Sequence, residues 1–237
     1  MFYNCTLLSS ENLNAAAAKI FSKNKVTNAQ FMFGSTNISE IPTLSMNSTT
    51  VGLFHNQTSL WNIDGMFSNC TNLSSLPVDL FGSNDLSSLK YARALFANCT
   101  NLQGVAVTND GNTSYTVPKG YFSKASHLTH IGAIPGYAFT ASSGTRGYFT
   151  IIGSTIYLYY PGMFANTKVK VEVDTAGVDS QTFINDLSSI KDVSYLFFIG
   201  DFNGVYTANN QTFKKDISVT NPYDPPVGKS IPVILQG

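Results

Sequence analysis

Two histidines in this sequence have the spacing of a metal site. His127 and His130 form an H-x-x-H pair, and on a helix this spacing of three would place two imidazoles on one metal ion. No third ligand follows nearby in the sequence. In the repeat described below, the two histidines match Asn72 and Ser75, which flank inward-facing leucines. The sequence therefore predicts outward-facing histidines and no metal ligand.

A serine and a lysine have the spacing found in serine acyl-enzymes. Ser87 and Lys90 form an S-x-x-K motif, which recurs at Ser188 and Lys191. An active site does not normally occur twice in equivalent segments, and neither an S-D-N nor a K-T-G motif accompanies this one. The pattern therefore predicts no catalytic nucleophile.

Two further motifs have ordinary explanations. Residues 228–230 (GKS) resemble the end of a phosphate loop, but Tyr223 stands where that loop requires a glycine. Residues 109–112 and 201–203 offer oxygen ligands for Ca²⁺, yet Asn-Gly and Asp-Gly are first of all turn formers. The sequence predicts no cofactor and no metal ion.

The three cysteines share one slot of a repeated phrase. The phrases are MFYNCTLLSS (1–10), MFSNCTNLSSLP (66–77) and LFANCTNLQGVA (95–106), which carry Cys5, Cys70 and Cys99. Three residues after other anchor phenylalanines the slot holds Thr36, Gln57, Ala125 and Thr167. A metal ligand or nucleophile would not be exchanged so freely within one chain, and an odd cysteine count argues against a disulfide framework. The slot is therefore predicted to hold a small, semi-polar side chain packed at a turn.

The asparagine before each cysteine has a matching structural explanation. Asn4, Asn69 and Asn98 begin N-x-T triplets, which could carry glycans in a eukaryotic secreted chain. Asparagine also tolerates a left-handed backbone and hydrogen-bonds its own turn. Repeat geometry is therefore the first explanation for these residues.

The repeat is anchored on phenylalanine. The slot residue lies three positions after Phe67, and apolar residues lie six and nine positions after Phe67. The same spacing recurs after Phe54, Phe96 and Phe122 without a gap. Anchors 13 to 15 residues apart indicate half-units, and two halves make a coil of about 28 residues, within the range of leucine-rich repeats. One coil cannot bury its own apolar face. We therefore expect stacked coils whose anchors line up along one interior spine.

This pattern resembles the BspA-like leucine-rich repeats of bacterial surface proteins, in the variety written MFxxCxxLxxL. Similar runs also look like those in tail or head appendages of gut phages. The residues that carry the resemblance are Met1-Phe2-Cys5, Met66-Phe67-Cys70-Leu73-Leu76 and Leu95-Phe96-Cys99-Leu102-Val105. The resemblance implies an α/β fold, a leucine-rich-repeat-like solenoid of short helices and short strands.

The chain divides into three parts. Residues 1–131 are predicted to form the solenoid, residues 132–217 to continue it as degenerate repeats with β-hairpin insertions, and residues 218–237 to form a Pro-rich cap or linker. Hairpins are expected between residues 105 and 118 and about Gly153-Ser154. Residues 168–174 alternate as a strand with its valines on one face, and residues 15–19 favour a helix.

The composition limits the classes of partner that this chain is expected to bind. Only 12% of residues are charged, and 14 basic residues balance 14 acidic ones, so the chain has no electrostatic reason to bind nucleic acid or an anionic membrane. No stretch is long and apolar enough to span a bilayer. The N-terminal residues lack the features of a signal peptide. This indicates a fragment or processed product, or a chain exported without a signal. A polar but uncharged surface favours an extracellular location, on a virion or a cell.

Tyrosines outside the repeat are the candidate binding residues. They are Tyr137, Tyr148, Tyr157, Tyr159, Tyr160 and Tyr206. Tyrosine suits binding surfaces and sugar stacking, although these residues could instead pack the hairpins onto the solenoid.

We therefore expect a non-enzymatic recognition or structural module. Its partner would be a host-surface protein, a glycan or a neighbouring virion subunit, and an oligomer is compatible with this. A virion component such as a phage tail or head appendage is favoured, with a secreted bacterial adhesin fragment as the alternative. A glycan-active enzyme is less favoured, because residues 106–160 contain a single carboxylate, Asp110.

Overall fold

In the part of the chain that the computed structural model describes, regular secondary structure consists of one helix and short antiparallel strands. The structure describes residues 2–7, 10–22, 26–82, 86–118, 120–132, 134–138, 148–152, 155–160, 162–165, 167–169, 216–218 and 230–232. Within them lie helix α1 (Ser10–Phe21) and the strands β1 (Leu44–Met46), β2 (Thr49–Val51), β3 (Val105–Asn109), β4 (Asn112–Thr116), β5 (Ile134–Ala138), β6 (Tyr148–Ile152), β7 (Thr155–Tyr160), β8 (Asp216–Ser218) and β9 (Ser230–Pro232). The strands form the pairs β1–β2, β3–β4 and β8–β9 and the sheet β5–β7–β6.

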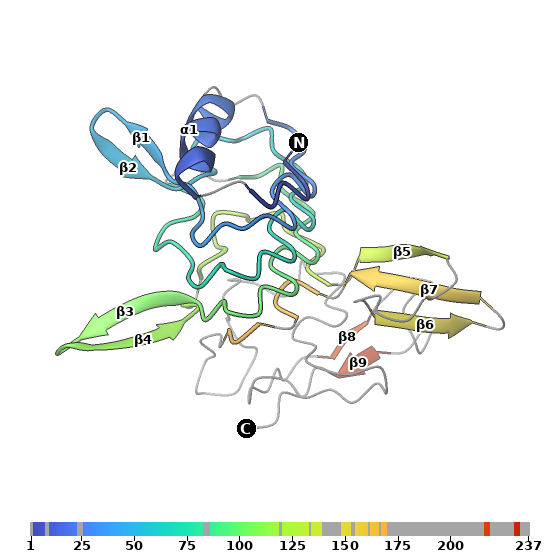
Figure 1. Cartoon of the computed structure of the whole chain (residues 1–237). Coiled ribbons are helices and arrows are strands. Elements are labelled where there is room, and N and C mark those ends of the chain that lie inside the picture. Colours follow the sequence, from blue (N-terminus) through green and yellow to red (C-terminus); the bar gives the residue numbers. More distant parts are fainter. Residues whose placement is uncertain are drawn as a thin grey trace.

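The segments between these elements lie on one another in parallel. Single parallel bridges join Asn28 to Asn62, Asn62 to Tyr91, and Tyr91 to His130. Figure 1 shows the segments stacked below the N-terminus, with β1–β2 and β3–β4 projecting from one side and β5–β7–β6 from the other. The chain therefore returns to the same edge of the stack once in each segment.

Turns and isolated bridges form these segments, where the sequence predicts short helices and short strands. Gly65 and Asn69 have positive φ angles of 58° and 59°, and Ala94 and Asn98 have 51° and 61°. Each pair encloses three residues around an anchor phenylalanine. Three residues are too few for an α-helical hydrogen bond between residues i and i+4, so the left-handed residues limit the chain at each of these anchors to turns.

Phenylalanine rings form two columns inside the stack. The first column contains Phe2, Phe33, Phe67, Phe96 and Phe164, whose successive centroids lie 5.6–5.8 Å apart with interplanar angles of 5–20°. The second contains Phe21, Phe54, Phe81 and Phe122, which are tilted or edge-on at 5.0–6.1 Å. The chain visits the columns alternately, so each circuit places one ring in each.

The expectation of a single interior spine is therefore wrong. Phe54 lies in the second column, whereas Phe67 and Phe96 lie in the first. All three nevertheless belong to one hydrophobic core. The half-units of 13 to 15 residues look alike in sequence because both halves present a phenylalanine to this core.

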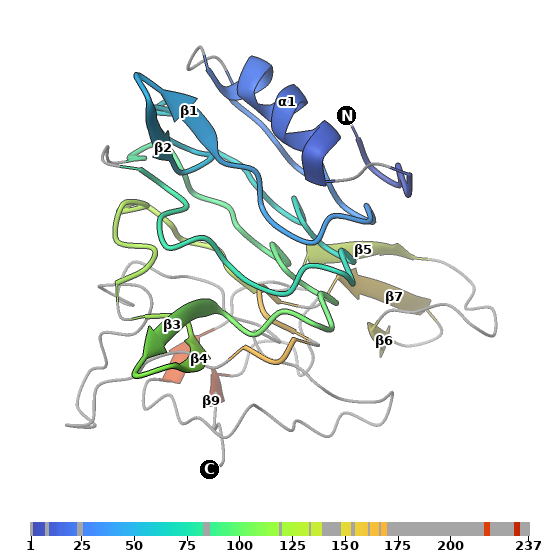
Figure 2. The ribbon, with the colours of Figure 1, turned by 60° about the vertical axis from the view of Figure 1, so that its left-hand side comes forward.

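The larger elements are insertions between the anchors. Helix α1 ends at Phe21 and buries Leu13, Ala17 and Phe21, so it covers the core at the N-terminal end (Figure 2). The β3–β4 ribbon lies where the sequence indicates a hairpin, with Asp110 and Gly111 at positive φ in its turn. The β1–β2 hairpin was not predicted, because its Asn47-Ser48 turn lacks the glycine that normally marks such a turn.

The sheet β5–β7–β6 interrupts one segment of the stack. The Ala94 N–H donates to the Gly132 carbonyl at 3.1 Å, and the Phe96 N–H donates to the Met163 carbonyl at 2.9 Å. These two hydrogen bonds are adjacent rungs, yet their acceptors are separated by the whole sheet. The sheet therefore leaves the stack after Gly132 and returns at Gly162.

The elements predicted for the C-terminal half of the chain lie only partly within the described residues. Val169 is buried and Lys168 is exposed, as the alternation predicted for 168–174 requires, but neither residue lies in a strand. The rest of that strand, the repeat expected near 183–197 and most of the Pro-rich segment lie outside the described residues. Within the described part of the chain, no helix has the length and apolar character required to cross a membrane.

Candidate functional site

Aromatic side chains follow the bridges along one edge of the stack. Trp61 and Tyr91 meet edge to face with centroids 5.7 Å apart, and the Tyr91 and His130 rings stack at 4.8 Å. The Lys90 N–H donates to the Trp61 carbonyl, and the His130 N–H to the Lys90 carbonyl. Because bridged segments lie about 4.8 Å apart, the rungs impose this stacking. We call Trp61, Tyr91 and His130 the aromatic strip.

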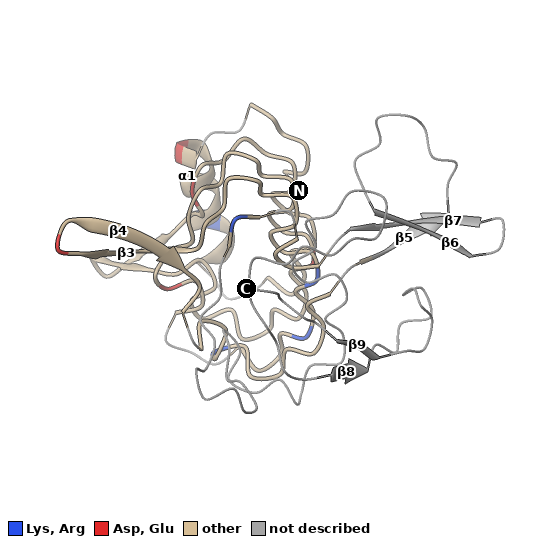
Figure 3. Ribbon diagram, turned by 90° about the horizontal axis from the view of Figure 1, so that it is seen from below, with Lys and Arg blue, Asp and Glu red and all other residues tan. Residues whose placement is uncertain are grey.

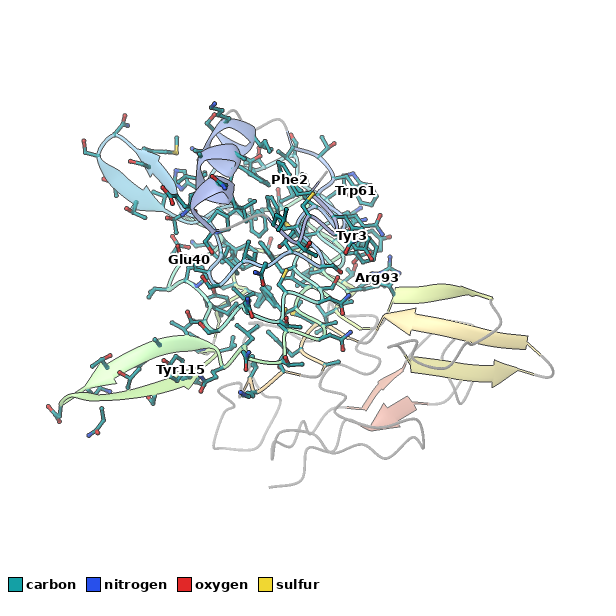
Figure 4. All side chains as sticks on the ribbon, viewed as in Figure 1. Phe2, Tyr3, Glu40, Trp61, Arg93 and Tyr115 are labelled. Atoms are coloured by element: carbon teal, nitrogen blue, oxygen red, sulfur yellow. The ribbon has the colours of Figure 1, made fainter. Side chains whose placement is uncertain are left out.

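An ion pair supports the middle of the strip. Arg93 donates from Nη2 to Asp64 Oδ2 at 2.6 Å and from Nε at 3.0 Å, and its backbone N–H donates to Oδ1 at 2.7 Å. The guanidinium also lies 5.2 Å from the Tyr91 ring centroid, within cation–π range. Figure 4 shows Trp61, Tyr3 and Arg93 on one side of the stack, away from Tyr115 on β4. Tyr91 is therefore held by both Arg93 and His130.

The Asp64 carboxylate is fully buried, and its Arg93 partner is 21% exposed. Burial raises the pKa of Asp64 above its usual range, while the hydrogen bonds and positive charge of Arg93 oppose that rise. Arg93 thus keeps an otherwise unfavourable buried charge in place beneath the aromatic strip.

A groove of about 640 Å³ opens beside Trp61 and Tyr91. Its walls come from three successive segments and consist of Ser59, Trp61, Ser87, Ser88, Lys90, Tyr91 and His127. Hydroxyl, ammonium and imidazole groups thus surround two aromatic rings. Volumes of this size are typical of sites for small ligands.

The groove does not join Ser87 and Lys90 as the S-x-x-K motif of an acyl-enzyme would require. Ser87 and Lys90 both line it, but no side-chain hydrogen bond joins them among the described residues, and Lys90 is exposed. An exposed ammonium is not the activated base that an acyl-enzyme mechanism requires. The described residues also contain no cluster of three His, Cys, Asp or Glu side chains able to hold a metal ion.

Comparisons of this chain with models of known protein families, with curated proteins and with solved structures found no match.

The predicted binding tyrosines fall mainly on one sheet. Tyr137 lies on β5, Tyr148 on β6, and Tyr157, Tyr159 and Tyr160 on β7. The strand register places Tyr148 opposite Tyr159, Tyr157 opposite Thr150 and Tyr160 opposite Ile134. Tyr206 lies outside the described residues. Five of the six candidates are thus brought together, on an element that begins four residues after His130.

The two histidines occupy different surroundings. His127 is exposed in the groove, whereas His130 is half-buried against Tyr91. The proposed match between His130 and Ser75 is wrong, because Phe122 belongs to the second column and Phe67 to the first. The bridge to Tyr91 gives the correct register.

The sequence interpretation missed the aromatic strip and its ion pair. Counted back from Phe67 and Phe96, Asp64 and Arg93 stand at the same offset with opposite charges. Trp61, the single tryptophan of the chain, likewise matches Lys90. A comparison of equal offsets in neighbouring segments would have paired Asp64 with Arg93, but it would not have found the aromatic strip, because the Trp61 ring meets Tyr91, which stands at a different offset.

The cysteine slot has a hydrogen-bonding role beyond its size. The Cys70 thiol donates to the Phe33 carbonyl at 3.2 Å, and the Cys99 thiol to the Phe67 carbonyl at 3.0 Å. The Thr36 and Thr167 hydroxyls donate to the anchor carbonyls of their own segments at 2.7 Å. In these copies the slot therefore supplies a small donor for an anchor carbonyl, which explains the exchange of Cys for Thr.

The asparagines that precede the slot link neighbouring segments. Asn4, Asn69 and Asn98 have positive φ angles of 59–61°, as expected from the repeat. Their side chains do not simply bond their own turn, because Asn98 Nδ2 donates to Asn69 Oδ1 at 2.8 Å and Asn69 Nδ2 to Ser35 Oγ at 3.4 Å. A ladder of polar side chains therefore follows the first phenylalanine column.

Thiol reactivity should separate the three cysteines. Cys5 is exposed, whereas Cys70 and Cys99 are buried, and burial raises the pKa of both buried thiols. In native protein at pH 8 we expect one thiol to react rapidly with Ellman's reagent and the other two only after unfolding. A Cys5→Ser variant should show no rapid phase. Rapid and complete reaction of all three native thiols would contradict this assignment.

Proposed function

We propose that this chain is a non-enzymatic recognition or structural module, built as a leucine-rich-repeat-like solenoid of the BspA-like kind. The repeated MFxxCxxLxxL phrase and the parallel bridges between segments support this architecture. The observation that carries the function is the convergence of Trp61, Tyr91 and His130, from three segments, on one face. A stack of this kind offers a partner an extended, rigid surface.

The partner we propose is a host-surface protein or glycan, or a neighbouring subunit of the same virion. Figure 3 shows charged residues thinly spread over the described ribbon, and the net charge of +0 provides no general attraction to nucleic acid or anionic lipid. The uncharged polar composition supports an extracellular place on a virion, as a phage tail or head appendage. A secreted bacterial adhesin fragment is the alternative.

The tyrosine-bearing sheet is the second element of this proposal. The strand register gathers Tyr148, Tyr157 and Tyr159 within a few residues of one another. The sheet also projects from the same segment that contributes His130 to the aromatic strip. Both features support a partner that contacts the strip and the sheet together.

A glycan-active enzyme is not favoured. Asp110, the single carboxylate of residues 106–160, is exposed in the turn between β3 and β4. Glycoside hydrolysis ordinarily requires two carboxyl groups that flank the scissile bond. An enzymatic function would be supported only if the protein hydrolysed model glycans and an Asp110→Asn variant lost that activity.

Whole-cell binding tests the recognition function. Fluorescently labelled protein should bind saturably to intact bacteria or to cultured epithelial cells, and an excess of unlabelled protein should displace it. A virion subunit should instead co-sediment with particles that lack it. The absence of saturable binding to both cell classes, together with no incorporation into particles, would refute the proposal.

A further inference from the structure

We propose that the groove beside the aromatic strip binds an acidic saccharide, a sugar that carries a carboxylate. This inference rests on the recognition function proposed above and names the ligand class for one face. It uses the groove formed by Ser59, Trp61, Ser87, Ser88, Lys90, Tyr91 and His127. The residues come from three segments, so the site exists only in the stacked protein.

Trp61 supplies the flat apolar platform that sugar rings require. It is 41% exposed, although its backbone is held by hydrogen bonds to Thr27 and Lys90. The weakly polar C–H groups of a pyranose ring pack well on the electron-rich face of an indole. A large exposed aromatic ring on a fixed backbone binds at low entropic cost.

Tyr91 makes the groove rigid. Its ring is stacked on His130 at 4.8 Å, lies 5.2 Å from the Arg93 guanidinium and meets Trp61 at 5.7 Å. Arg93 is in turn fixed on the buried Asp64 carboxylate. The wall of the groove is therefore in place before a ligand arrives, and these contacts leave Trp61 as the more exposed stacking surface.

The polar lining suits a ligand with many hydroxyl groups. Ser59, Ser87 and Ser88 each offer a hydroxyl that both donates and accepts. Among the described residues none of these three side chains forms a hydrogen bond, so their capacity is available. A peptide groove would instead present a larger apolar area and pockets for side chains.

The charge of the lining selects an acidic sugar. Lys90 and His127 are exposed in the groove, and no Asp or Glu stands among its lining residues. Lys90 has no ion-pair partner within the described part of the chain. A carboxylate placed beside Lys90 would gain a charge-assisted hydrogen bond. The net charge of +0 limits this attraction to the groove.

Calorimetric titration of the whole chain tests the site. The probes are 3′-sialyllactose, trigalacturonate and, as the neutral control, lactose. Wild-type protein should bind at least one acidic probe about tenfold or more tightly than lactose, and added NaCl should weaken that preference. A preference for 3′-sialyllactose would indicate sialylated glycans as the source, and a preference for trigalacturonate would indicate uronic-acid polysaccharides.

Two variants and two controls assign the binding to the groove. Trp61→Ala should weaken binding of all saccharides about tenfold or more, because the stacking platform is lost. Lys90→Gln should abolish the preference for acidic probes without affecting lactose. Tyr115 on β4 and Lys19 on α1 lie outside the groove, so the Tyr115→Ala and Lys19→Gln variants should bind the saccharides as the wild type does. Circular dichroism of each variant verifies that the fold is retained.

The outcomes distinguish failure of this inference from failure of the proposed recognition function. Acidic-sugar binding that survives in Trp61→Ala and Lys90→Gln would overturn the groove assignment. Hexaglutamate, titrated in the same way, is the acidic peptide control. Absence of binding to any saccharide, together with intact whole-cell binding or with binding of hexaglutamate, would overturn the ligand class and leave the recognition function standing. Absence of saccharide binding, of cell binding and of incorporation into particles would overturn both proposals.

Discussion

Replacement of Phe67 by alanine should lower the free energy of unfolding by about 3–5 kcal/mol. Phe67 is fully buried and lies in the first column between Phe33 at 5.7 Å and Phe96 at 5.8 Å. The substitution removes a ring that contacts the segments above and below, so it leaves a cavity and breaks the column. Flanking rings held by backbone rungs cannot collapse fully into that space.

Urea denaturation followed by circular dichroism measures this loss. Phe54→Ala, in the second column, should cost a similar amount, because both columns belong to one core. Val78→Ala is the surface control, since Val78 is 80% exposed. Cys70→Ala should be far milder, because the Thr36 hydroxyl still donates to the Phe33 carbonyl. A loss below about 1 kcal/mol for Phe67→Ala would show that the column is not part of the native core.

Removal of the Arg93 side chain should cost about 3–5 kcal/mol at neutral pH, because it strands a buried carboxylate. Asp64 is fully buried and would lose two side-chain hydrogen bonds and its only ion-pair partner among the described residues. The same change removes the cation from beside the Tyr91 ring. Arg93→Ala should therefore loosen the aromatic strip as well as the stack.

The sign of the pH dependence distinguishes this cause from simple loss of packing. Burial already raises the pKa of Asp64, and in Arg93→Ala only the backbone N–H of residue 93 still opposes that rise, because the charge and the side-chain hydrogen bonds of Arg93 are gone. A carboxyl group with a raised folded-state pKa stabilises the protein below its usual titration range, and this contribution is lost as the pH rises through the folded pKa. Arg93→Ala should thus be closer to wild type at pH 5 than at pH 8.

A double variant provides the matched control for the ion pair. Asp64→Asn combined with Arg93→Ala should recover stability at pH 8 relative to Arg93→Ala alone, because the stranded charge is gone. Thermal unfolding of the wild type and the two variants at pH 5 and pH 8 measures both effects. An equal loss for Arg93→Ala at both pH values, without rescue, would mean that the Asp64 charge is not the cause.

Local sequence was sufficient for the repeating parts of the molecule. The phenylalanine anchors, the small slot at Cys70 and Cys99, and the left-handed asparagines were identified from spacing, and the structure places them in the core and its turns. The β3–β4 hairpin followed from Asn-Asp-Gly. These features depend on residues a few positions apart, and backbone sterics and burial of an apolar face determine them.

Only the tertiary structure decided which segments lie on one another. The sequence did not separate the two phenylalanine columns, because the two halves of each circuit present the same spacing to one core. It did not stack Trp61, Tyr91 and His130, because those contacts follow the parallel bridges between segments and not equal offsets from the anchors. Insertions of different length, from α1 to the sheet β5–β7–β6, separate the segments along the chain. The register across such gaps is set by hydrogen bonds between distant residues, and no local period encodes it.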